Sequence, residues 1–202
     1  MNKYRALGLV LGCVLVLTVV LGVGYAQQKK ELTPAEQALF DKTVAIVQNW
    51  GKDPKIVAFV KAKNASGETL GQVKEQDKIW IATPGLSAFM KSILENDCSK
   101  YLLELRKLTP AVGEFFLMDL NGALVGETNK TSDYWQGDED KHIKTCQIGG
   151  QGATFIDKIK YDESSLKFSR QVSVPVIDPD TGNAIGAITV GVDLDKLIKL
   201  SK

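Results

Sequence analysis

The stretch Glu114–Thr128, which reads EFFLMDLNGALVGET, decides the fold of this chain. An aromatic and apolar run, Glu114–Asp119, comes first. It is followed by Asn121-Gly122, the dipeptide most typical of a two-residue hairpin turn. The chain then returns through Ala123–Thr128. This stretch therefore predicts two antiparallel strands joined by a tight turn.

Three segments after the hairpin also predict strands. Ala153–Tyr161 and Leu166–Val176 alternate between apolar and polar residues, as a half-buried strand does. Ala184–Leu194 is rich in glycine and β-branched residues, and it follows the turn at Pro179–Asn183. With the hairpin, these segments make five strands.

Before the hairpin the apolar residues recur at helical spacing. Thr33-Pro34-Ala35-Glu36 is a capping box with proline at the first helical position, so a helix begins there. Asp53-Pro54 starts a second helix, and a weaker helical pattern runs from Leu70 to about Ile81. The strongest pattern predicts one helix of about 20 residues between Leu86 and Leu108.

Helices followed by a run of antiparallel strands are typical of an α+β fold rather than of an alternating parallel sheet. We expect a five-stranded antiparallel sheet with a long helix packed on one face. A short amphipathic tail, Asp195–Leu200, closes the chain. Residues 27–202 are expected to form a single domain.

The first 26 residues predict a targeting segment. Met1–Arg5 carries two positive charges, and Ala6–Ala26 then contains no charged residue. A signal peptide cleaved after Ala26 and an uncleaved membrane anchor both explain this pattern. Either explanation places the rest of the chain outside the cytoplasm, in the periplasm or an equivalent compartment, free or anchored in the inner membrane.

Charge and cysteine content narrow the function classes. The formal net charge is +1, so no basic excess indicates nucleic-acid binding. Cys98 and Cys146 are the only cysteines after residue 26. In an oxidising compartment they are candidates for a disulfide, and two buried free thiols are the alternative. Their spacing matches no zinc or haem motif, so no metal or other cofactor is expected.

The loop Thr128–His142, TNKTSDYWQGDEDKH, concentrates aromatic and acidic residues. His142 is the only histidine, and the chain has no nucleophile-elbow motif, so we expect no enzyme activity. The glycine precedes the acids, which is the wrong order for a calcium loop. Gly137–Asp140 is better explained as a helix start, with His142 a solvated or hydrogen-bonded helix residue.

Several motifs together resemble extracytoplasmic Cache (PDC-type) sensor domains, which are PAS-like α+β modules. The hairpin is followed by T-x-x-T-S-D-Y-W-Q-G-D-E, a strand that ends Y-D-E-S, S-V-P-V-x-D, and I-G-A-I-T-V-G-V-D. The resemblance covers about residues 33 to 196. It implies a ligand between the sheet and the loop after the hairpin.

Candidate ligand-binding residues lie in that loop and on the predicted strands. The two neighbouring aromatics have polar tips suited to a pocket wall, and Asp133 suits a ligand ammonium group. Arg170 is a charge among apolar strand residues, which indicates either an anionic ligand or an ion pair with Asp133 or Asp162. The alternative for the aromatics is packing over the sheet edge. The candidate residues are Asp133, Tyr134, Trp135, Tyr161, Asp162, Arg170, Ser173 and Thr189.

The sequence therefore predicts a non-catalytic sensor-type domain that binds a small polar metabolite, which is an amino acid, an amine or a carboxylate. Its partner would be a membrane receptor or kinase, or a second copy of the chain bound through the long helix. The alternative is a ligand-free interaction or dimerisation module of PAS-like fold. Small residues at Ser173, Thr189 and Gly191 favour the ligand-binding hypothesis, because bulky ones there would fill a pocket.

Overall fold

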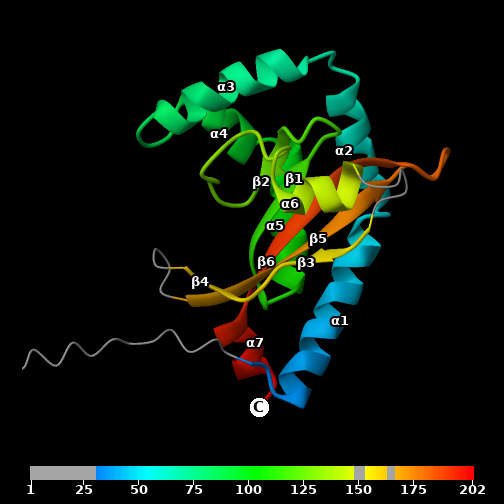
Figure 1. Ribbon diagram of the computed structural model, residues 1–202, viewed down its shortest axis with the longest axis vertical. Helices are drawn as coiled ribbons and strands as arrows, with labels where there is room; N and C mark the ends of the chain where they lie inside the picture. Colours follow the sequence, from blue (N-terminus) through cyan, green and yellow to red (C-terminus); the bar gives the residue numbers. More distant parts are fainter. Residues whose placement is uncertain (1–30, 148–152, 163–166) are drawn as a thin grey trace, which may run out of the picture.

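The structure is a computed structural model that describes residues 31–147, 153–162 and 167–202. Most helices precede the strands, as Figure 1 shows. The helices are α1 (Pro34–Trp50), α2 (Pro54–Asn64), α3 (Leu70–Ala82), α4 (Ala88–Leu94), α5 (Asp97–Leu108), α6 (Asp140–His142), the π-helix η1 (Ile143–Gln147) and α7 (Leu194–Leu200). The strands are β1 (Val112–Met118), β2 (Leu124–Glu127), β3 (Phe155–Ile156), β4 (Lys160–Asp162), β5 (Lys167–Ile177) and β6 (Ala184–Asp193).

The strands form one antiparallel sheet in the order β2-β1-β6-β5-β3, with β4 also paired to β5. The predicted α+β fold is confirmed, and so is the hairpin, in which Phe116 lies opposite Glu127. The predicted strand Ala153–Tyr161 is interrupted. The structure has two short strands there, β3 and β4, and both pair with β5: β3 lies opposite Ser173 and Val172, and β4 lies opposite an earlier part of β5. Over the residues that the structure describes, the sheet therefore has six strands in five positions rather than five continuous strands.

The hairpin turn is fixed by the side chain of Asp119. One of its carboxylate oxygens, Oδ1, accepts hydrogen bonds from the backbone N–H groups of Asn121 at 2.9 Å and Ala123 at 2.8 Å. Gly122 has a φ of 85°, in the left-handed region that favours glycine. A Cβ at Gly122 would lie 2.4 Å from the Cα of Gly137, so the turn also packs against the loop that follows the hairpin.

The capping signals in the sequence produce the expected helix starts. The Thr33 hydroxyl accepts from the Glu36 N–H at 3.4 Å, and Glu36 accepts from the Thr33 N–H at 2.8 Å. Asp53 caps α2 by accepting from the N–H groups of Lys55 and Ile56. Each cap satisfies backbone donors that have no partner inside the helix.

The single helix predicted between Leu86 and Leu108 is wrong, because the structure has two helices, α4 and α5. The break falls at Asn96, whose side-chain oxygen accepts from the Ser99 N–H at 2.8 Å as an N-cap. Its side-chain nitrogen donates to the Val125 carbonyl of β2 at 2.9 Å. The asparagine side chain competes for hydrogen bonds that the backbone would otherwise make within a continuous helix. The spacing of apolar residues does not reveal this competition.

Both faces of the sheet are covered. Residues of β1 alternate between the faces, so Phe115 and Leu117 join one core cluster and Phe116 and Met118 join another. The first cluster packs under α1, α2 and α5, and we call this side of the sheet the helix face. The second includes residues of α3, α4 and the segment 123–147, and we call this side the loop face. In Figure 1, α1 runs along one edge of the molecule, α3 crosses the top and α6 lies in front of the strands.

Cys98 and Cys146 belong to different core clusters and are free thiols, so the candidate disulfide between them is not formed. Cys98 lies on the helix face beside Gly126, and Cys146 lies on the loop face. Burial raises the pKa of the Cys98 thiol to about 12 and that of Cys146 to about 11. The alternative expectation, two buried free thiols, is confirmed.

No helix within residues 31–147, 153–162 and 167–202 is both long and apolar enough to cross a membrane. The predicted signal peptide or anchor, residues 1–26, lies outside the described residues.

The free thiols give a direct test of the fold. Native protein treated with iodoacetamide should remain unmodified at Cys98 and Cys146, because a buried thiol with a raised pKa yields almost no thiolate at neutral pH. Both should react once the protein is unfolded in denaturant without reductant. Peptide mass mapping resolves the two positions. A Cys98–Cys146 linked peptide in the unreduced sample would contradict the structure.

Candidate functional site

The loop after the hairpin is held against α3 by specific hydrogen bonds. One oxygen of Asp77 accepts from the backbone N–H groups of Tyr134 at 2.8 Å and Trp135 at 3.0 Å. The indole N–H of Trp80 donates to the Thr131 carbonyl at 3.1 Å. Two side chains of α3 therefore fix the loop's backbone.

Tyr134 is fully buried within the core of the loop face. Its ring stacks on Trp80 at 5.8 Å between centroids and meets Phe89 edge to face at 5.1 Å. Its hydroxyl lies 2.9 Å from the Lys63 ammonium and 3.1 Å from a Glu68 carboxylate oxygen. Burial raises the pKa of this hydroxyl to about 12. Tyr134 thus packs against residues of α3 and α4, and a role for it in ligand binding stays a prediction.

The two residues on either side of Tyr134 are also bonded within the protein. Trp135 is half-buried, its indole N–H donates to the Asn121 carbonyl at 2.8 Å, and the Lys74 ammonium lies 4.2 Å from its ring centroid. A carboxylate oxygen of Asp133 accepts from Ser132 at 2.7 Å and from Gln136 at 2.5 Å. These contacts shape the loop itself.

The predicted strand residues are divided between the two faces of the sheet. The hydroxyls of Ser173 and Thr189 are buried on the loop face and lie 2.8 Å apart, within hydrogen-bond distance. Arg170 lies on the helix face, where its guanidinium stands 4.9 Å from the centroid of the Phe40 ring. Tyr161 packs on Phe168 at 5.0 Å, and Asp162 is the last residue of β4. The eight predicted residues thus occupy several environments, and their role in ligand binding stays a prediction.

The structure adds acidic and amide side chains that the sequence analysis missed. Strand register aligns Glu127, Phe116, Thr189 and Ser173 in one row across the loop face. In the neighbouring row, Glu114 and Gln171 stand on either side of Gly191, and the Gln171 amide donates to the Glu114 carboxylate at 3.0 Å. We call this set the polar face; its members are Glu114, Glu127, Gln171, Ser173 and Thr189.

Glu127 is the most unusual group of the polar face. Its side chain is fully buried, and one carboxylate oxygen, Oε2, accepts from the Thr131 N–H at 2.9 Å. The other oxygen, Oε1, has no hydrogen-bond partner within the described part of the chain. Burial raises the pKa of Glu127 to about 7, and the Thr131 N–H and the Lys130 charge only partly oppose this effect. Glu114 adds a further increase by charge repulsion.

The short helices α6 and η1 lie against the loop face. The Lys141 ammonium stands 5.1 Å from the centroid of the Phe116 ring and 3.0 Å from a Glu139 carboxylate oxygen. The Lys144 ammonium stands 4.9 Å from the centroid of the Phe155 ring. Two ammonium groups on lysine stems thus already pack over aromatic rings on this side of the sheet.

His142 is a structural residue of α6. Its ring is fully buried, with Nε2 lying 3.1 Å from the Asp119 carbonyl and Nδ1 lying 3.3 Å from the Gln147 amide. Burial lowers its pKa, so the ring is neutral at physiological pH. The prediction of a hydrogen-bonded helix residue is confirmed. The predicted helix start is confirmed as well, because α6 begins at Asp140, whose carboxylate pairs with Lys144 at 2.7 Å.

The described ranges contain no group of three or more His, Cys, Asp or Glu side chains placed to hold a metal ion.

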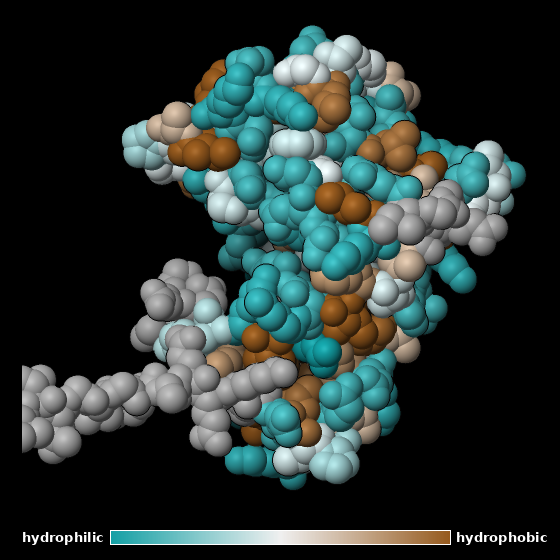
Figure 2. Space-filling view, viewed as in Figure 1, coloured by the Kyte–Doolittle hydropathy of each residue, from teal (hydrophilic) through white to brown (hydrophobic). Residues whose placement is uncertain are grey.

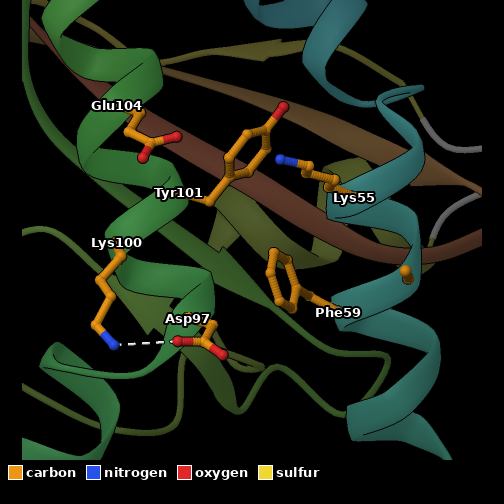
Figure 3. A pocket seen from close by; sticks show the side chains of 7 residues that line it. Lys55, Phe59, Asp97, Lys100, Tyr101 and Glu104 are labelled. Atoms are coloured by element: carbon orange, nitrogen blue, oxygen red, sulfur yellow. Dashed lines mark hydrogen bonds and ion pairs between the residues drawn. The ribbon is translucent and has the colours of Figure 1, made fainter.

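A concave region lies between α2 and α5, on the outer side of the helix face. Figure 3 shows Lys55 and Phe59 projecting from α2 towards Tyr101 of α5, with the Lys55 ammonium 4.6 Å from the tyrosine ring centroid. Lys100 and Asp97 pair along its rim at 3.1 Å. Its charged side chains are exposed, which is typical of a solvated groove.

No family model matches this chain, and no curated protein matches its sequence. Among solved structures, the chain is similar to the sensor domain of the histidine kinase DctB from V. cholerae, with 17% identity and a TM-score of 0.48. The alignment covers 81% of this chain but 52% of that one, so the chain spans about half the length of this relative. The E. coli DcuS sensor domain is similar with 12% identity and a TM-score of 0.47, covering 82% and 96% of the two chains.

The sensory domain of the Campylobacter jejuni chemoreceptor Tlp3, solved with isoleucine bound, is similar with 14% identity and a TM-score of 0.38. That alignment covers 85% of this chain and 68% of the other. These structural neighbours are sensor domains of histidine kinases and chemoreceptors, the class that the sequence motifs resemble.

The raised pKa of Glu127 predicts a specific dependence of stability on pH. A carboxyl group whose pKa is higher in the folded protein than its unfolded value of 4.5 makes its full contribution to the free energy of unfolding at low pH. That contribution falls between pH 4.5 and about pH 7, by about 3 kcal/mol in total. Glu127→Gln should remove this decrease, so the variant should gain stability relative to the wild type as the pH rises.

The measurement is the free energy of unfolding by urea at several pH values for the wild type and the variant. Glu104→Gln is the matched control, because Glu104 is exposed on α5. Parallel pH profiles for the wild type and Glu127→Gln would show that Glu127 has an ordinary pKa in the folded protein.

Proposed function

We propose that this chain is the ligand-binding part of an extracytoplasmic sensor that acts by binding and not by catalysis. One observation carries the proposal: Glu127 is fully buried on the loop face and one of its carboxylate oxygens has no partner among the described residues. Buried polar atoms nearly always have a hydrogen-bond partner. An unpartnered carboxylate oxygen beside other polar side chains therefore marks a position for a donor from outside the chain.

The charge of the polar face selects among the ligand classes that the sequence left open. Glu114 and Glu127 are both acidic, and the nearby Lys141 ammonium already pairs with Glu139 at 3.0 Å. An ammonium group would find charge-assisted acceptors here, whereas a free carboxylate would meet like charge. An amine or an amino acid is therefore preferred over a simple carboxylate.

The loop contacts provide a route from the polar face to the rest of the molecule. Glu127 accepts from the Thr131 N–H, and the Thr131 carbonyl accepts from Trp80 of α3. A ligand that stabilises ionised Glu127 would strengthen the first of these bonds. Ligand occupancy would then bias the order of the loop against α3, and a membrane receptor, a kinase or a second copy of the chain would detect this change.

One observation favours the alternative function, a ligand-free interaction module. Large apolar side chains are exposed on and beside α3, with Ile79 56%, Ile81 61% and Leu86 50% accessible. In Figure 2, hydrophobic residues are interspersed with hydrophilic ones over much of the visible face. Scattered apolar residues of this kind are common on monomers, so they support the alternative less than the buried carboxyl supports ligand binding.

A melting-temperature screen tests the proposed function. The full chain in neutral detergent is heated with amino acids, diamines, monoamines and dicarboxylates at fixed ionic strength. A ligand present at 100 times its dissociation constant should stabilise the fold by about 2.7 kcal/mol. We expect compounds with an ammonium group to raise the melting temperature of the wild type and to act much less on Glu127→Gln.

Glu104→Gln serves again as the control and should respond like the wild type. Stabilisation by dicarboxylates alone would keep the sensor function but reverse the ligand class. No response from a well-folded wild type to any compound would reject ligand binding in favour of the interaction module.

A further inference from the structure

A polar cavity lies on the helix face, near the N-terminal end of α1. Its volume is about 470 Å³, within the range of pockets that bind small molecules. Residues just before and within α1 line one side, and the interrupted edge strand with β5 lines the other. The polar lining residues are Glu31, Gln37, Asp157, Lys158 and Arg170.

Arg170 is the central cation of this cavity, and its orientation is fixed. Its Nε–H donates to the Asp157 carbonyl at 2.9 Å, and its guanidinium stands 4.9 Å from the centroid of the fully buried Phe40 ring. Together these contacts hold the planar guanidinium in one position, because the hydrogen bond fixes Nε and the cation–π contact attracts the charged group to the Phe40 ring. The two terminal nitrogens make no hydrogen bond with any residue that the structure describes in detail.

The nearby carboxylate of Asp157 does not neutralise Arg170. It pairs with Lys160 at 2.5 Å and accepts from the Lys158 N–H at 2.8 Å. Although partial burial acts to raise the pKa of Asp157, the bond from Lys160 holds it below its usual value. Asp157 contacts Arg170 through its backbone carbonyl and not through its carboxylate, so the guanidinium charge stays available to another partner.

We propose that this cavity binds a small oxyanion, a carboxylate or phosphate group, which the terminal nitrogens of Arg170 hold in a two-point contact. The guanidinium fork matches two oxygens of either group. Lys158 is exposed at the cavity and adds positive charge. Glu31 lines the opposite part and opposes anion binding by like charge.

The oxyanion has two sources, a free metabolite and a lipid headgroup. Glu31 is five residues after Ala26, where the apolar segment ends. Five residues span at most about 18 Å. If residues 6–26 remain as an anchor, the cavity lies within reach of phospholipid headgroups. The cavity lies on the opposite face of the sheet from the polar face, so oxyanion binding here does not depend on the proposed function.

Isothermal titration calorimetry of the full chain in neutral detergent tests the inference. The probes are inorganic phosphate, acetate and glycerol 3-phosphate. Chloride at matched ionic strength is the reference. The lipid source is tested by melting temperature in micelles mixed with phosphatidylglycerol or with phosphatidylcholine. At least one oxyanion should bind the wild type. Arg170→Gln should weaken that binding about tenfold or more, because it removes hydrogen bonds to a charged group.

Two further variants separate binding from structure. Arg170→Lys keeps the charge but loses the two-point contact, so it should fold and bind with intermediate affinity. Glu31→Gln removes the opposing charge and should bind the oxyanion more tightly than the wild type. A response to phosphatidylglycerol alone, lost in Arg170→Gln, would assign the site to a lipid headgroup.

Three results would overturn the inference. The first is that no probe and no anionic lipid acts on the wild type beyond the chloride reference. The second is that Arg170→Gln responds as the wild type does. The third is that Glu31→Gln loses stability and gains no affinity, since Glu31 would then be the ion-pair partner of Arg170.

Discussion

The structure depends on the apolar alternation of β1, which gives this strand two faces that both exclude water. Phe115 and Leu117 are buried on one side and Phe116 and Met118 on the other. A strand of this kind needs cover on each side of the sheet. The helices α1, α2 and α5 cover one side. On the other side the cover comes from α3, α4 and the segment that follows the hairpin, and that segment encloses the polar residues of the neighbouring strands.

Burial of polar groups under the loop explains why the candidate site has unusual electrostatics. Glu127 is the last residue of the apolar strand β2 and lies directly opposite Phe116, so any cover for the phenyl ring also removes the carboxyl group from water. The hydrogen bond from the Thr131 N–H compensates only part of the lost hydration. The sheet therefore places a titratable group against the loop that is attached to α3. On the opposite face, Arg170 has a fixed position and no anionic partner among the residues that the structure describes, so the two faces favour ligand groups of opposite charge.

Much of the fold could be predicted from the sequence because its signals are local. Four signals act within a few residues, and each gives the expected element: the Asn121-Gly122 turn, the capping box at Thr33, the alternation of Leu166–Val176 and the β-branched residues of Ala184–Leu194. The errors came from non-local contacts. Asn96 ends α4 and begins α5 while bonding to β2, and the edge strand breaks where Arg170 binds the Asp157 carbonyl.

The candidate site was less predictable for the same reason. Aromatic residues in the loop suggested a pocket wall, but the partners that bury Tyr134 are Trp80 and Phe89, about 50 residues earlier in the chain. Glu127 was overlooked because a single acidic residue at the end of a strand carries no sequence signal. The hairpin register, which follows from the turn, places it opposite Phe116 and was the only available indication.

We propose that the buried carboxyl of Glu127 is the group that meets a ligand ammonium. The most direct measurement is its side-chain carboxyl carbon chemical shift, followed by NMR as a function of pH, with and without a stabilising amine. The account predicts a titration midpoint near pH 7 in the free protein. It also predicts a clear decrease of that midpoint when the amine binds, because a bound cation favours the ionised form. A midpoint near 4.5 in the free protein, or one that the bound amine leaves unchanged, would contradict it.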